Sequence, residues 1–80
     1  MEGVMIAVFA RNQQEFNHTF KDSTPGLFKH IRNINDVRGR RFAGVVEMAI
    51  WYDTDESSFQ KMDIAFANLK ERQPELFKKQ

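Results

Sequence analysis

The chain has no cysteine, little glycine and proline, and almost no net charge. Its 80 residues include no Cys, four Gly and two Pro, and the formal net charge is +1. Without thiols the protein can form neither a disulfide nor a thiolate metal site, and its two histidines, His18 and His30, lack carboxylates at metal-ligand spacing. We therefore expect no metal ion. Because the absence of disulfides suits a reducing compartment, a cytoplasmic location is also expected.

Long hydrophobic runs are missing as well. The first apolar stretch, residues 4–10, is far too short to span a bilayer and lacks the basic flank and cleavage site of a signal peptide. We expect a protein without a membrane partner. A chain of 80 residues predicts one compact domain over residues 1–80. For residues 74–80 we consider a flexible tail, or a segment that packs back through Leu76 and Phe77.

The positive charge is concentrated in one place. Residues 29–41, KHIRNINDVRGRR, hold five of the twelve Lys and Arg residues and a single acid, Asp36. This basic segment carries a charge of about +4 in a chain that is otherwise slightly acidic, and such a concentration is where a partner is expected to dock. The low net charge of +1 argues against a protein that coats DNA through many phosphate contacts.

The first half of the chain predicts a strand, a helix and a second strand. Residues 4–10 form a continuous apolar run without alternation, typical of a strand covered on both faces. Asn12 is a good N-cap with Glu15 in capping-box register, so a helix is expected over residues 13–21. After a loop at residues 22–26, we favour a strand at residues 28–33. The alternative is a helix capped by Thr24 with Pro25 in its first turn.

The second half predicts a long strand and a long helix. Residues 42–52 are rich in β-branched and aromatic residues, and we expect one strand there with Val46, Met48, Ile50 and Tyr52 facing the core. A helix is expected from about residue 55, with an apolar stripe that runs from Phe59 to Leu69 and a stop at Pro74. The sequence therefore predicts a small α/β (or α+β) domain, a β-α-β-β-α unit with a three-stranded sheet and two helices. Parallel strands, or a hairpin between the second and third strands, both fit this order.

One short stretch resembles a known family. Residues 37–46, VRGRRFAGVV, are similar to the RGR-x-F element that precedes the acidic strand of P-loop helicases and packaging ATPases. The strand here continues without an Asp-Glu pair and the chain has no phosphate loop, so no ATPase residue is carried over. The resemblance implies only that parallel pairing is favoured.

Most candidate binding residues belong to the basic segment. Its arginines offer planar, multi-donor groups that match phosphates and carboxylates, and the alternative is that they pair within the domain with Asp53, Asp55 and Glu56. Arg11 follows the first strand, where parallel sheets often bind ligands. Trp51 and Tyr52 could anchor a partner or stack on a base. The candidate binding residues are Arg32, Arg38, Arg40, Arg41, Lys29, Arg11, Trp51 and Tyr52.

Catalytic motifs are not visible. The serines lack a nucleophile-elbow pattern, both histidines are expected at the surface, and no nucleotide-binding glycine motif is present, so we expect neither an enzyme nor a cofactor. The leading hypothesis is a non-enzymatic binding protein that acts through a basic surface on a larger protein or nucleoprotein complex. An accessory or inhibitor protein of a phage or mobile element is one such case. The alternative is a module that binds phosphates of nucleic acids or nucleotides, and a third hypothesis is a homo-oligomer.

Overall fold

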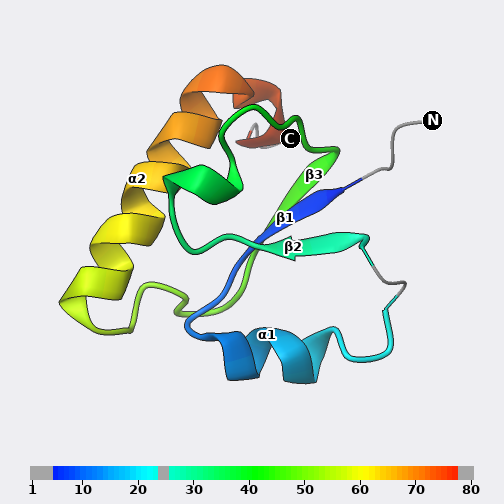
Figure 1. The fold of residues 1–80 in the computed structure, drawn as a ribbon, viewed down its shortest axis with the longest axis vertical. Coiled ribbons are helices and arrows are strands. Elements are labelled where there is room, and N and C mark those ends of the chain that lie inside the picture. The colour runs from blue at the N-terminus through cyan, green and yellow to red at the C-terminus, as the bar shows by residue number, and fades with distance from the viewer. Residues whose placement is uncertain (1–4, 24–25, 78–80) are drawn as a thin grey trace.

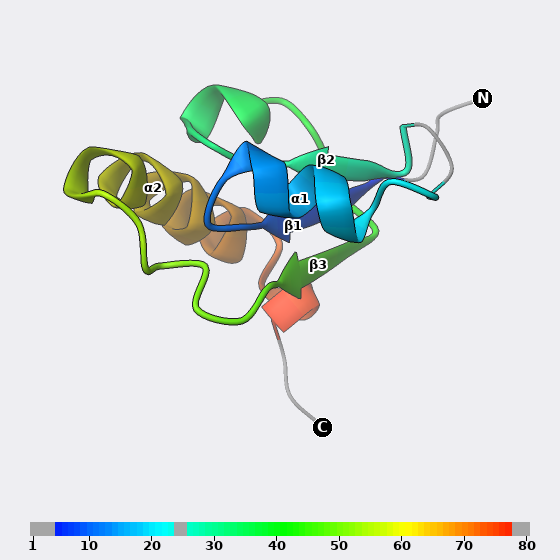
Figure 2. The ribbon, with the colours of Figure 1, turned by 90° about the horizontal axis from the view of Figure 1, so that it is seen from below.

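The computed structural model describes residues 5–23 and 26–77, and its centre is a three-stranded parallel sheet. The strands are β1 (Ile6–Phe9), β2 (Phe28–His30) and β3 (Gly44–Glu47), in the order β2-β1-β3. Figure 2 shows β1 between its two neighbours. The predicted small α/β domain is confirmed. The rival hairpin is wrong, because β2 and β3 each pair with β1, in parallel.

The helical elements lie on both faces of this sheet. They are α1 (Gln13–Thr19), α2 (Glu56–Arg72) and two short 3-10 helices, η1 (Ile34–Asp36) and η2 (Pro74–Phe77). The β1–β2 and β2–β3 connections run in opposite directions across the sheet, so right-handed crossovers place α1 and η1 on opposite faces. Within residues 5–23 and 26–77, no helix is both long and apolar enough to cross a membrane.

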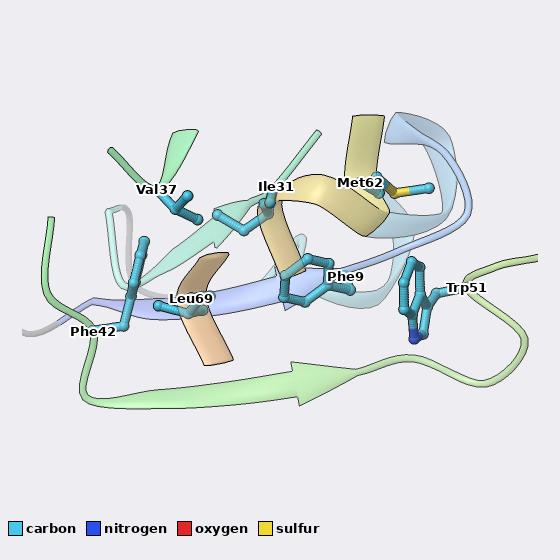
Figure 3. Packing of buried hydrophobic residues seen from close by; sticks show 9 residues of the cluster. Phe9, Ile31, Val37, Phe42, Trp51, Met62 and Leu69 are labelled. Carbon is cyan, nitrogen blue, oxygen red and sulfur yellow. The ribbon is translucent and has the colours of Figure 1, made fainter. Parts of the chain in front are cut away.

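Aromatic contacts identify the two faces. Phe16 of α1 stacks on His30 of β2 with ring centroids 5.0 Å apart, and His30 is in register with Val8 of β1. The neighbouring Phe9 points to the other face, where it belongs to the buried cluster that includes residues of α2. Figure 3 shows Phe9 between Leu69 and Trp51 in this cluster. The sheet is therefore covered on both sides, as the uninterrupted apolar run of the first strand predicts.

The start of α1 is confirmed in part. Asn12 caps the helix by accepting a hydrogen bond from the Glu15 backbone N–H at 2.8 Å. The Glu15 carboxylate does not complete a capping box, because it takes hydrogen bonds from the Arg11 guanidinium instead. The helix also ends at Thr19, earlier than expected, and Phe20 packs on Phe28 with ring centroids 4.3 Å apart.

The preferred strand in the ambiguous region is confirmed, although it is shorter than predicted. β2 covers Phe28–His30, and Asn33 then caps η1 by accepting a hydrogen bond from Asn35 N–H at 2.9 Å. Asn33, the last residue of the predicted strand, therefore lies outside β2 and serves as a cap. Thr24 and Pro25, which the alternative helix required, lie outside the described residues.

The predicted strand at residues 42–52 is wrong in its second half. β3 ends at Glu47, and a turn follows in which Ile50 has a φ of 48°. Its backbone bonds run from Trp51 N–H to Met48 O and from Asp53 N–H to Ile50 O. Because the turn breaks the two-residue alternation, the predicted faces do not hold: Trp51 is buried, whereas Ile50 and Tyr52 are exposed.

The end of the described chain packs on the core. η2 follows α2 directly, and Leu76 and Phe77 lie against the buried cluster. Phe77 meets Phe66 edge to face with ring centroids 5.1 Å apart. Residues 78–80 of the predicted tail lie outside the described residues.

Candidate functional site

The structure divides the basic segment into three parts. Lys29 lies in β2, and its Nζ is 3.5 Å from an oxygen of Asp36. Burial raises the pKa of the Asp36 carboxyl, but the backbone N–H groups of Arg32 and Asn33 and the charge of Lys29 outweigh it, so the pKa is lowered overall. Lys29 and Asp36 therefore stabilise the β2–η1 connection as a local ion pair.

The second part is an exposed turn of residues 38–41, which we call the arginine turn. It lies between Val37 and Phe42, both of which are buried. Gly39 adopts a φ of 71°, a conformation that L side chains rarely adopt. Arg38, Arg40 and Arg41 are all exposed, so the turn presents three guanidinium groups to solvent.

Two residues at the end of α2 hold this turn in place. Gln73 is 2% exposed, and its side chain accepts a hydrogen bond from Phe42 N–H at 2.9 Å and donates one to Phe42 O at 3.0 Å. Arg72 Nη2 donates to Val37 O at 3.0 Å and to Arg40 O. Figure 1 shows the connection after η1 passing the C-terminal end of α2. The sequence did not identify Gln73 and Arg72, because no local pattern links them to a turn more than 30 residues earlier.

The acids expected to neutralise the arginines are engaged elsewhere. Asp53 pairs with Arg11 at 3.3 Å, and Asp55 caps α2 by accepting from Ser58 N–H at 3.0 Å, which lowers the pKa of Asp55. Arg41 pairs with Glu75 at 3.5 Å between two exposed side chains. Among the described residues, the structure gives Arg38 and Arg40 no ion pair.

The third part, Arg32, lies with Arg11 at the carboxyl ends of β1 and β2. Both line a cavity of about 470 Å³, together with Lys61 and the start of α2. The pKa of Arg11 is raised because Glu15 accepts its hydrogen bonds and carries the opposite charge. Of the three cations here, Arg11 is thus already compensated by nearby carboxylates, while the structure gives Arg32 and Lys61 no ion pair among the described residues.

His30 also lines this cavity, and the expectation that it lies at the surface is wrong. It is 7% exposed, because β2 places it under Phe16. Its Nδ1 is 3.2 Å from Gln13 Oε1, and its Nε2 has no hydrogen-bond partner among the described residues. Burial, opposed by the Ala10 carbonyl and assisted by the charge of Arg32, lowers the pKa of His30.

Trp51 and Tyr52 lie at the other end of the sheet from the arginine turn. They follow the carboxyl end of β3, whereas the turn precedes its amino end. Both residues line a second cavity, of about 630 Å³, with Phe59 and Phe66 of α2. Trp51 is 7% exposed and its Nε1–H donates to Glu47 Oε1 at 3.4 Å, whereas Tyr52 is 58% exposed. Neither aromatic residue joins the arginines of the turn in a single site.

The described residues contain no group of three or more His, Cys, Asp or Glu side chains that could hold a metal ion. What the arrangement offers chemically is charge, hydrogen-bond donors and aromatic surface at fixed positions. No protein-family model matches the chain, and no curated protein or solved structure shows significant similarity to it.

Proposed function

We propose that the protein is a non-enzymatic binding protein whose arginine turn contacts the carboxylates or phosphates of a larger protein or nucleoprotein complex. One observation carries the proposal. The backbone of the turn is held by buried hydrogen bonds from Gln73 and by Arg72, while Arg38 and Arg40 are exposed and have no ion pair within the described chain. A contact loop that is already ordered loses little conformational entropy on binding. Arginine also forms two-pronged hydrogen bonds with carboxylate and phosphate.

This role fits a small cytoplasmic protein that acts by occupying a surface of its target. Accessory and inhibitor proteins of phages and mobile elements work in this way, and the proposal includes that class. Inhibition would follow from covering a surface that the target needs for its own substrate or partner.

A second candidate function rests on the cavity at the carboxyl ends of β1 and β2. Arg11, Arg32 and Lys61 line it, and ligands of parallel sheets bind at this edge. A nucleotide or nucleic-acid phosphate is the ligand that this set would bind. His30 offers no donor to such a ligand, because its Nδ1 donates to Gln13 Oε1 and the Nε2 of the neutral ring can only accept.

The test compares two charge-reversed double variants in a pull-down from native lysate. Arg38→Glu with Arg40→Glu changes the turn, and Lys21→Glu with Lys70→Glu makes the same charge change at exposed positions elsewhere. We expect the first pair to weaken capture of a specific partner by tenfold or more, because hydrogen bonds to charged groups are worth about 1.5–3 kcal/mol. The second pair should retain the partner. Equal retention by both double variants would refute the proposal.

Salt dependence separates the two candidate functions. Binding to phosphates should weaken steeply between low and moderate salt, because each phosphate contact releases a counterion. A protein surface with an apolar centre should lose much less affinity over the same range. An Arg32→Glu variant that loses binding while the turn variant keeps it would favour the cavity.

A further inference from the structure

The second cavity, which we call the aromatic cavity, has four rings in its wall. Trp51 lies against the other three, with ring centroids 6.1 Å from Tyr52, 6.2 Å from Phe59 and 5.5 Å from Phe66. Tyr52 is 58% exposed, whereas Trp51 is buried. Figure 3 shows Trp51 at the edge of the core, next to the connection that leads from β3.

Only acidic charges line this cavity. Glu47, Glu56 and Asp63 contribute carboxylates, and no Lys or Arg is among its lining residues. The lining thus carries a formal charge of −3 in a protein whose net charge is +1. These acids form no ion pair with any described residue. The cavity therefore combines aromatic rings with three solvent-exposed carboxylates, and this lining favours a cation.

Helix capping does not explain the central acid. Asp63 lies in the middle of α2, between Phe59 and Phe66, which are four residues before it and three residues after it. These spacings place the carboxylate on the same helix face as the two rings. Asp63 is exposed to solvent and has no hydrogen-bond or ion-pair partner among the described residues, so its carboxylate is available to a cation placed against the two rings.

The approach to the cavity is strained. Ile50 immediately precedes Trp51 and adopts a φ of 48°, which is unfavourable for a β-branched residue. Its side chain is 45% exposed, so hydrophobic burial of Ile50 offsets little of the backbone strain. Such strain is typical of segments that hold a binding group in a required orientation. Here the turn buries Trp51 and leaves Tyr52 exposed.

We propose that the aromatic cavity binds an arginine side chain presented by an exposed segment of a partner protein. A guanidinium stacks its plane on aromatic rings and donates to carboxylates at its edge, and this cavity supplies both groups together. The volume of about 630 Å³ exceeds that of one guanidinium, so neighbouring residues of the partner segment would lie across the opening. The site is separate from the arginine turn and has the opposite charge, so it stands whether or not the turn binds as proposed above.

Trp51 provides the signal for the test, because it is the only tryptophan in the chain. The probes are four capped tripeptides, Gly-X-Gly, in which X is arginine, citrulline, lysine or glutamate. We expect a saturable change in fluorescence with the arginine peptide and binding at least threefold weaker with lysine. Citrulline keeps the shape without the charge and should bind at least tenfold more weakly, and the glutamate peptide should not bind.

Two variants and one control complete the test. Asp63→Asn should weaken binding of the arginine peptide about threefold, as expected for loss of one partly exposed ion pair. Tyr52→Leu should weaken it by a similar factor through loss of the ring face. Glu71→Gln, an equal charge change at an exposed position of α2 outside the cavity, should leave binding unchanged. Circular dichroism confirms that each variant is folded.

Three results would overturn the proposal. The first is no saturable response to the arginine peptide by folded wild-type protein. The second is equal affinity for the arginine and citrulline peptides, which would indicate an uncharged apolar pocket. The third is a concentration-dependent change of the Trp51 signal without peptide, lost in Asp63→Asn, which would identify a second copy of this chain as the occupant.

Discussion

Gln73 is expected to be among the most important polar residues for stability, and Gln73→Ala tests this directly. Its side chain satisfies both backbone polar groups of the buried Phe42. Alanine would leave the N–H and the C=O without partners, and each such group costs about 1–3 kcal/mol when buried. Allowing for partial relaxation and entry of water, we expect a loss of about 3 kcal/mol in the free energy of unfolding.

Such a loss is large for this domain. A protein of this length has an unfolding free energy of roughly 4–12 kcal/mol, so the variant should lose a quarter or more of its stability. In thermal unfolding the midpoint should fall by about 12–24 °C. Urea denaturation followed by circular dichroism gives the same free energy independently, with a slope close to that of wild type.

Gln60→Ala is the matched control. Gln60 lies in α2, the helix that Gln73 follows, and makes one exposed hydrogen bond, to Glu56 at 3.2 Å. Its replacement should change the unfolding free energy by less than about 0.5 kcal/mol. If Gln73→Ala costs no more than Gln60→Ala, the backbone of Phe42 is satisfied in another way, and the argument that the arginine turn is preorganised loses its main support.

Three other features can be tested by substitution. Arg72→Met removes the contacts from α2 to the arginine turn, so trypsin should cut within residues 38–41 several-fold faster than in wild type. Burial lowers the pKa of His30, so the unfolded chain takes up the proton first and the unfolding free energy should fall as the pH drops through about 6.5. His30→Phe should flatten that fall between about pH 7.5 and 5.5, whereas His18→Gln should retain it. Ile50→Asn should raise the unfolding free energy by about 0.5–1 kcal/mol, because asparagine tolerates the left-handed conformation better, and an unchanged or lower value would argue against strain at this turn.

The sequence predicts well what local chemistry determines. Asn12 caps α1 as predicted, α2 begins close to the predicted residue 55, and the continuous apolar run became the central strand. The prediction of one strand over residues 42–52 was wrong in its second half for a physical reason. Ile50 is a strong strand former, and no propensity indicates that such a residue adopts a left-handed conformation in a turn. The tertiary contacts of Trp51 with Phe9 and Phe66 favour that turn over its local preference.

The candidate binding residues show the same division. Charge patterning picked out the arginines of residues 38–41, because their concentration is visible along the chain. It could not identify Arg72 and Gln73, whose role depends on how the end of α2 meets a distant turn. Charge patterning also grouped Arg32 with the arginine turn. The two lie at opposite ends of the sheet, because the crossover carries the chain from the carboxyl end of β2 to the amino end of β3. Neighbours in sequence are thus separated, and Arg32 lies with Arg11 and Lys61 instead.

α2 connects the two proposed binding surfaces. Its first half supplies Phe59 and Asp63 to the aromatic cavity, and Arg72 at its end holds the arginine turn. Because this helix of 17 residues packs on the core along its length, binding at one surface should not reshape the other. Any energetic coupling between them must then come from a partner that touches both. Free energies lost by the Arg38→Glu, Arg40→Glu pair and by Asp63→Asn should add if both surfaces contact one partner independently. If separate partners bind, each change should weaken only its own partner.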